Sequence, residues 1–356
     1  MRTWAAAATC VAFVGCGEPT APPSLPPVPV SFDEAAVEKS SLSGDVIAAA
    51  EHFRRGFELA AQGGDTEAVA AYRLAIGESP AYVEAHYNLG NALARQFNYP
   101  ASMKSFSKVL ELDSTHISAR HNLAALYVKQ LNYAQAIAEH QTVLRLDENH
   151  VATYYDLAYI YFIRGEYEQV EKFLNHGQLL APQDARFPRL RGRMRHKQLR
   201  YAEAVAALRT AVQIDSTDAV TYADLAQAQL KAGEYEVAVI TAERSIDLDP
   251  HDKDPRFILT NALRRLDRGE EARDVLEDFR ALDEVESEIR KNLRILGNDP
   301  GDHEARAMLG LLYAGQGKFA EATEAYRLAV FLAPDSAHYH NNLGNYYQRT
   351  GMCQLP

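Results

Sequence analysis

Residues 305–335 read ARAMLGLLYAGQGKFAEATEAYRLAVFLAPD, and they contain two short helical patterns separated by Gly317. In the first pattern Leu309 and Tyr313 stand four residues apart, so they share one face of a helix. The second pattern ends before Pro334, because proline cannot continue a helix. The stretch therefore predicts two helices joined by a tight turn at a glycine.

The same arrangement recurs along the chain with a period of 34 residues. Three kinds of residue mark it: a tyrosine, a residue that is usually alanine, and a leucine. The tyrosines are Tyr99, Tyr133, Tyr167, Tyr201 and Tyr235, the second series is Ala68, Ser102, Ala136, Val170, Ala204, Ala238 and Ala272, and the leucines include Leu89, Leu123, Leu157 and Leu225. One helical pair cannot bury its apolar face alone, so the period predicts an all-α solenoid in which neighbouring pairs stack.

The segment YYDLAYIYFIRGEYEQVEKFL, at 154–174, resembles a tetratricopeptide repeat, and residues 305–335 resemble one nearly position by position. The resemblance extends over roughly residues 49–353 and implies a right-handed superhelix of helix–turn–helix repeats. We predict seven units of 34 residues over 49–286, an inserted helix over 287–302, and one further unit with a lone first helix over 303–353. In unit 185–218 the apolar residues Phe187, Leu190 and Met194 are out of phase, which predicts one extra residue before Tyr201.

The N-terminus is a different kind of sequence. Residues 1–15 contain an apolar run that is too short to span a bilayer, and they fit a signal peptide. Residues 13–16 resemble the bacterial lipoprotein cleavage box, which implies lipidation of Cys16. Residues 16–48 form a proline-rich tether and lead-in. We therefore expect a lipid-anchored protein of the bacterial cell envelope that faces the periplasm, with membrane contact through the anchor only. The alternative is a cytoplasmic protein whose N-terminus is not a signal.

The composition narrows the possible functions. The formal net charge of −11 argues against nucleic acid as a partner. The three cysteines offer the repeat region no disulfide pair and no metal-ligand spacing, so we expect no metal and no cofactor. The chain has neither a phosphate-binding glycine loop nor a nucleophile elbow, and we expect no catalytic residues and no enzyme activity.

The resemblance implies that the first helix of each unit lines a concave groove. We number positions from the unit starts 49, 83, 117, 151, 185, 219, 253, 303 and 337. The candidate groove residues are Asn88, Asn91, Arg95, Asn122, Lys129, Tyr155, Tyr159, Arg189, Arg193, His196 and Lys231. Asparagine amides can hydrogen-bond the backbone of an extended peptide, or they can bond to neighbouring backbone or water. Tyr155 and Tyr159 form either a stacking platform or part of the core.

The densest charge in the chain lies at 186–200, where seven arginine and lysine residues occur without an acidic residue. Arginine favours bidentate contact with carboxylates and phosphates. The cluster predicts an anionic ligand: an acidic peptide, a terminal carboxylate or an anionic polysaccharide. The alternative is a solvated cationic face that is paired with acidic residues such as Asp156 and Asp224.

These observations predict a non-catalytic scaffold that binds an extended, acidic segment of a partner protein in envelope assembly or secretion. Two alternatives stay open. One is a lipoprotein of polysaccharide export, and the other is the repeat arm of a larger, truncated enzyme such as a glycosyltransferase. The sequence stops within about ten residues of Tyr347 without a second helix, where solenoids usually carry a capping helix. Either the chain is truncated, which we favour, or a partner or second copy covers that edge.

Overall fold

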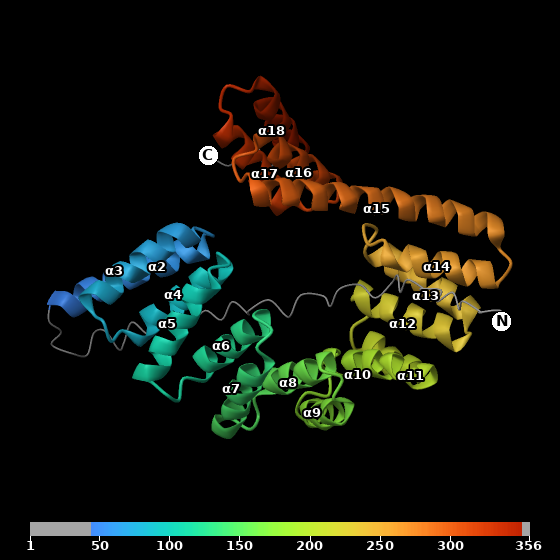
Figure 1. Cartoon of the computed structure of the whole chain (residues 1–356), viewed down its shortest axis with the longest axis horizontal. Coiled ribbons are helices and arrows are strands. Elements are labelled where there is room, and N and C mark those ends of the chain that lie inside the picture. The colour runs from blue at the N-terminus through green and yellow to red at the C-terminus, as the bar shows by residue number, and fades with distance from the viewer. Residues whose placement is uncertain (1–43, 351–356) are drawn as a thin grey trace, which may run out of the picture. The chain divides into compact units, whose positions relative to one another are not determined.

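The computed structural model describes residues 44–350 and the side chains of residues 46–348. The predicted signal peptide, Cys16 and most of the proline-rich tether lie outside the described residues. Residues 44–350 form 17 helices, α2 to α18, and no strand (Figure 1). The prediction of an all-α helical repeat solenoid is confirmed.

First and second helices alternate along the chain. The first helices are α2 (Gly44–Ala61), α4 (Val83–Arg95), α6 (Ile117–Lys129), α8 (Val151–Ile163), α10 (Arg186–Lys197), α12 (Ala219–Ala232), α14 (Asp254–Arg265), α16 (His303–Gly315) and α18 (Ala337–Thr350). The second helices are α3 (Asp65–Glu78), α5 (Tyr99–Leu112), α7 (Tyr133–Leu146), α9 (Tyr167–Leu180), α11 (Tyr201–Ile214), α13 (Tyr235–Leu248), α15 (Gly269–Asn298) and α17 (Phe319–Leu332). The five regularly spaced tyrosines are the first residues of α5, α7, α9, α11 and α13, so they mark the architecture.

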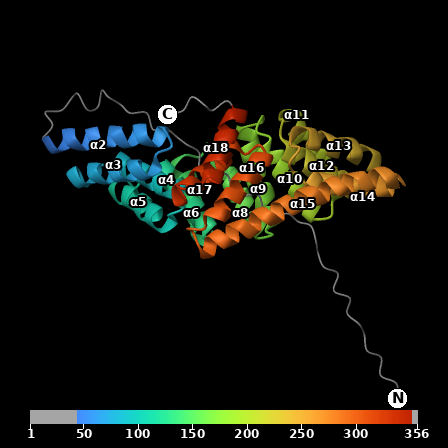
Figure 2. The same ribbon diagram turned by 90° about the horizontal axis from the view of Figure 1, so that it is seen from above.

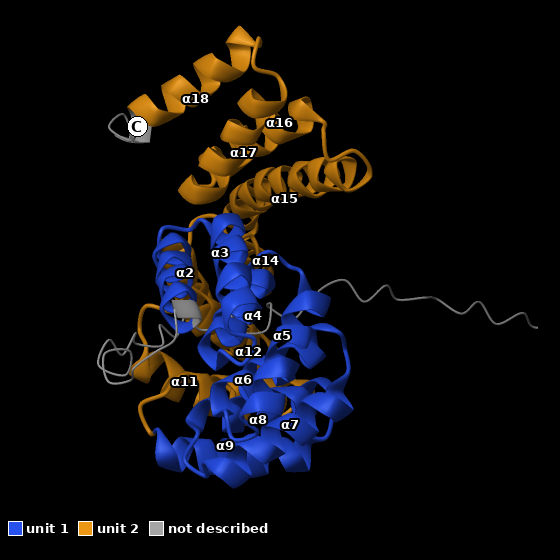
Figure 3. Cartoon of the chain, turned by 90° about the vertical axis from the view of Figure 1, so that its left-hand side faces the viewer, with its two compact units in different colours: residues 1–181 blue, residues 182–356 orange. Residues whose placement is uncertain are grey.

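The helices belong to two compact units (Figure 3). Residues 1–181 contain α2–α9 and residues 182–356 contain α10–α18. Within each unit a second helix contacts both its own first helix and the next one, as α3 contacts α2 and α4. The buried clusters follow this stacking, since Phe53, Tyr72 and Leu89 of these three helices share one core cluster. None of the described helices is long and apolar enough to cross a membrane.

The turn between the two helices has the same backbone conformation in eight pairs. Position 15 has a positive φ in each of them, and glycine occupies it at Gly63, Gly165, Gly233 and Gly317. The same left-handed conformation is held by Phe97, Leu131, Leu199 and Asp267, with φ between 57° and 60°. Left-handed backbone is unfavourable for residues with a Cβ, so these four turns are strained by the packing of the helices they join.

A small residue at position 8 allows the two helices to approach closely. A Cβ built on Gly90 would lie 2.7 Å from Phe106 Cε1, and one built on Gly192 would lie 2.4 Å from Leu208 Cγ. Gly192 stands three periods after Gly90, and α10 ends in phase with the other first helices. The prediction of an extra residue before Tyr201 is therefore wrong. Arginines at 189, 191 and 193 had obscured the repeating pattern of unit 185–218.

The segment predicted as an inserted helix, 287–302, contributes the last part of α15. This helix continues from Gly269 to Asn298 and is 30 residues long, about twice the length of the other second helices (Figure 2). It ends before Pro300, which is consistent with the inability of proline to continue a helix.

Candidate functional site

The candidate surface consists of positions 5, 6, 9, 12 and 13 of the first helices, which we call the first-helix face. A recurring contact joins position 5 of one first helix to position 6 of the next. Asn122 Nδ2 lies 3.4 Å from Tyr87 Oη, and Arg189 Nε lies 3.0 Å from Asp224 Oδ2. His121 Nε2 and Asp156 Oδ2 lie 2.7 Å apart in the same relation. Side chains at position 6 thus bond between neighbouring repeats.

The predicted asparagine residues take part in such internal bonds. Asn88 is buried and donates to the backbone oxygen of Glu84 at 2.9 Å. Asn122 is buried and donates to Asn91 Oδ1 at 2.9 Å, in addition to its contact with Tyr87. These amides serve the repeat structure, and the exposed residues of the face are better placed to meet a partner.

Cations occupy position 13 at the ends of several first helices. Arg95, Lys129, Lys197, Lys231 and Arg265 are all exposed. Arg95 forms a bidentate pair with Asp65, with a shortest distance of 2.6 Å. A cation at a helix C-terminus is stabilised by the helix dipole, which is one structural reason for the pattern.

The arginine cluster lies on α10, a helix without an acidic residue. Arg189 is half-buried and bonds to both Asp218 and Asp224. Arg186 pairs with Asp184 at 2.6 Å, and on the turn Arg200 pairs with Glu203 at 2.6 Å. The pairing with Asp224 that we considered is therefore present, whereas Asp156 is paired with His121. Arg193 is half-buried and Lys197 is exposed.

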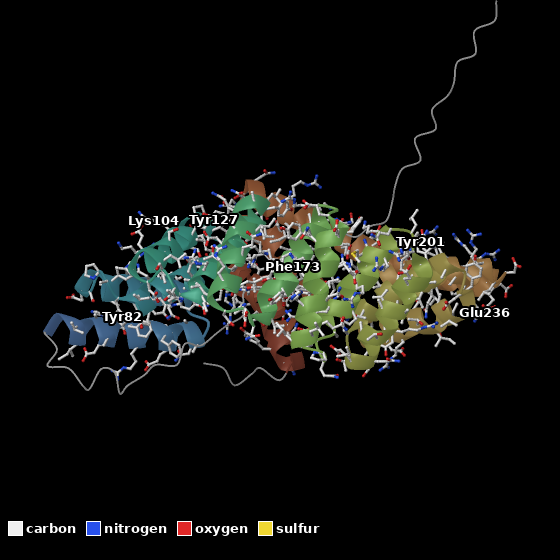
Figure 4. The ribbon with its side chains drawn as sticks, turned by 90° about the horizontal axis from the view of Figure 1, so that it is seen from below. Tyr82, Lys104, Tyr127, Phe173, Tyr201 and Glu236 are labelled. Carbon is white, nitrogen blue, oxygen red and sulfur yellow. The ribbon has the colours of Figure 1, made fainter. Side chains whose placement is uncertain are left out.

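His196 lies at position 12 of the same helix and packs against the second helix of its pair. Its ring centre is 5.4 Å from that of Tyr201, the labelled residue that begins α11 in Figure 4. Burial lowers the pKa of His196; Asp224 opposes this shift, while Lys231 and Lys197 reinforce it. The Nε2 atom is buried without a hydrogen-bond partner. His196 is therefore a largely neutral, half-buried side chain at physiological pH.

The two candidate tyrosines stack on each other along α8. The ring centres of Tyr155 and Tyr159 lie 6.4 Å apart, and the rings are inclined by 15°. Tyr159 is buried and Tyr155 is half-buried. Burial favours the core interpretation for Tyr159 over a platform that is open to a ligand.

Comparison with protein families identifies the repeat. Models described as tetratricopeptide repeat match residues 129–194, 83–116, 223–287 and 280–337, and a model described as TPR repeat matches residues 56–96. The chain is a tetratricopeptide repeat protein. Repeats of this family support a protein-interaction scaffold and are typically non-catalytic. No curated protein matches the sequence.

Solved structures show the same fold at low sequence identity. Yeast Tom70 is 14% identical with a TM-score of 0.50, and the match covers 85% of this chain and 64% of Tom70. PilF of Pseudomonas aeruginosa is 16% identical with a TM-score of 0.49, over 64% of this chain and 96% of PilF. YrrB, described as a TPR protein with an unusual peptide-binding site, is 19% identical with a TM-score of 0.41, over 52% of this chain and 95% of YrrB.

Two residues of the first-helix face were missed by sequence reasoning, Tyr87 and Asp218. Tyr87 contacts Asn122, and Asp218 contacts Arg189. A spacing of one period plus one residue connects Tyr87 with Asn122 and Arg189 with Asp224. Searching this tetratricopeptide repeat sequence for polar pairs at that spacing would have found the link between neighbouring first helices.

Proposed function

We propose that this tetratricopeptide repeat protein is a non-catalytic scaffold that binds an extended acidic segment of a partner protein along its first-helix face. The observation that carries the proposal is α10, which has five arginines and one lysine but no acidic residue in a chain of net charge −11. Such local charge concentrates acidic partners and orients them by bidentate contacts.

Exposed cations on neighbouring first helices extend this positive region beyond α10. Lys197 and Lys231 occupy position 13 of α10 and α12, one repeat apart, and both are exposed. Because Arg189 is bonded to Asp218 and Asp224, we assign it to the support of this surface. The lysines are assigned to direct contact with the partner.

A charge-reversal pair tests the proposal with a matched control. Lys197→Glu with Lys231→Glu changes the first-helix face, whereas Arg209→Glu with Arg244→Glu makes the same change in net charge on α11 and α13. We expect a fluorescent glutamate-rich peptide to bind the wild-type chain and the control, and to bind the lysine variant at least about tenfold more weakly, with all binding reduced at high salt.

Three results distinguish the possibilities in this assay. Equal loss in both variants would indicate a response to net charge alone and would contradict the proposed surface. A uronic-acid oligomer that binds with the same dependence on Lys197 and Lys231, while the peptide does not, would favour the polysaccharide alternative. Absence of binding by the glutamate-rich peptide would reject an acidic partner.

We also propose that the scaffold acts at the bacterial cell envelope, anchored through Cys16. The support is the apolar segment and the cleavage-box resemblance of residues 1–16. Expression of the full sequence in a bacterium should give a chain that incorporates labelled palmitate and partitions with membranes. Cys16→Ser should abolish both. Labelling that persists in this variant would contradict the anchor.

A further inference from the structure

A buried histidine occupies a position that other repeats fill with apolar or aromatic residues. His140 on α7 is at position 24, and its equivalents are Tyr72, Phe106, Leu174, Leu208, Ala242 and Tyr326. All of these side chains are buried, and His140 itself is 1% exposed. Its Nδ1 atom is buried and makes no hydrogen bond. A buried polar atom without a partner is rare enough in folded proteins to require an explanation.

Two further metal-ligating side chains lie beside this imidazole. His121 comes from α6 and Asp156 from α8, and one ligand atom from each of the three residues lies within 4.8 Å of the others. The rings of His121 and His140 are 5.4 Å apart in an edge-to-face arrangement. The side chains of His121 and Asp156 are 12% and 17% exposed, which leaves a route from solvent to the cluster.

We propose that His121, His140 and Asp156 bind a divalent first-row transition-metal ion, with Zn²⁺ as the ion that best fits the ligand set. Imidazole nitrogen and carboxylate oxygen bind Zn²⁺ at about 2.0–2.2 Å. Tetrahedral geometry at these lengths separates neighbouring ligand atoms by roughly 3.3 Å. The hydrogen-bonded pair His121–Asp156 would open by about 0.6 Å to reach this spacing.

The chemistry of the ligands selects against the other common cations. Ca²⁺ and Mg²⁺ prefer sites built from oxygen ligands, whereas two of the three ligands here are imidazoles. A tetrahedral ion would retain one position for water or a fourth group. His150 lies near this position, since its ring centre is 5.2 Å from that of His121, but its Nδ1 is 2.9 Å from the Thr153 hydroxyl.

The repeat geometry explains why these residues meet. His121 and Asp156 make the contact between positions 5 and 6 that also joins Arg189 to Asp224. In the pair with Arg189 the residue at position 24 is Leu208, which cannot bind a metal. Only where His140 replaces the apolar residue does the common contact become a three-ligand group within residues 46–348. A bound ion would connect α6, α7 and α8 and so join two neighbouring repeats.

Zinc titration of the untagged full-length chain tests the site. We expect isothermal calorimetry to give one tight Zn²⁺ per chain and Zn²⁺ to raise the unfolding temperature. His140→Phe should weaken binding by at least about 100-fold, since even the loss of outer-shell partners costs 10–100-fold. Phenylalanine stands at the equivalent position 106, so this variant should fold. Asp156→Asn should also weaken binding.

A surface histidine and a spectroscopic probe make the result specific. His176→Asn removes an exposed histidine of α9 and should leave Zn²⁺ binding unchanged. Co²⁺ should give the visible d–d bands of a four-coordinate ion with the wild-type chain and with this control, but not with His140→Phe. Zinc affinity that is equal in wild type and His140→Phe would overturn the proposal, and so would the absence of tight binding by the wild-type chain.

Discussion

A methyl group added at Gly310 should destabilise the protein although it would extend a good helix-forming pattern. Gly310 lies at position 8 of α16, where an added Cβ would be 2.6 Å from Tyr326 Cδ1 and 2.9 Å from Tyr326 Cγ. The tyrosine is buried, and its ring is 5.5 Å from that of Tyr346. The ring would have to move by about 0.8 Å to reach an ordinary contact distance, against neighbours that are close-packed.

Two opposing terms determine the size of the effect. Replacing glycine by alanine inside a helix stabilises it by about 0.8–1.0 kcal/mol. Overpacking a filled core costs about 1–3 kcal/mol. We therefore expect Gly310→Ala to lower the free energy of unfolding by about 1 kcal/mol, with a range of about 0–2 kcal/mol.

The chain contains its own control at Gly344. This glycine has the same repeat position in α18, but a Cβ there would meet no atom within 4 Å. Gly344→Ala should therefore express only the gain in helix propensity and stabilise the protein by up to about 1 kcal/mol. The difference between the two variants, about 1–3 kcal/mol, measures the overpacking directly because the propensity term cancels.

Urea denaturation followed by circular dichroism measures both variants. Repeat arrays need not unfold in one step, so hydrogen exchange of amides in α16 and α18 should accompany the denaturation curves. We expect faster exchange in α16 of Gly310→Ala and equal or slower exchange in α18 of Gly344→Ala. If the two variants changed stability by the same amount, the close approach of position 8 to position 24 would not limit the packing.

Three further predictions follow from the strained turns and the charged face. Leu131→Gly should raise the free energy of unfolding by up to about 1 kcal/mol, because Leu131 has φ of 60° and an exposed side chain, while Gly165→Leu should lower it; denaturation that ranks them in the opposite order would refute the strain. Arg189→Met should destabilise by about 1–2 kcal/mol because it leaves Asp224 and its neighbour without their cation, and a double-mutant cycle with Asp224→Leu that shows no coupling would exclude this cause. His196→Phe should flatten the loss of stability on acidification: burial lowers the pKa of His196, so below about pH 6.5 the unfolded chain gains a proton that the folded chain does not bind; the free energy of unfolding from pH 7.5 to 5 gives the slope, and a slope equal to that of the wild type would contradict it.

The repeat frame could be predicted from the sequence because a few geometric requirements recur every 34 residues. Second helices begin at Tyr99 and its equivalents, and the glycines at 165, 233 and 317 adopt the left-handed turn. Reasoning from apolar residues was insufficient at α10, where Gly192 keeps the frame although arginines surround it. It also could not show that residues 287–298 continue the preceding helix, because the same apolar spacing fits one long helix or two short ones.

The candidate metal group was missed for a different reason. Its members are separated by 19 and 16 residues, which matches no short metal-binding motif, and His140 falls at a position that the repeat pattern assigns to the core. Equivalent positions in a repeat protein can be compared within one chain, and this comparison carries information that a single-copy core does not offer. Six equivalents of His140 are buried without an imidazole, so the fold does not require one there. A polar residue that replaces them next to His121 and Asp156 therefore needs a cause outside the packing of the repeat, and a bound ion supplies one that calorimetry can measure.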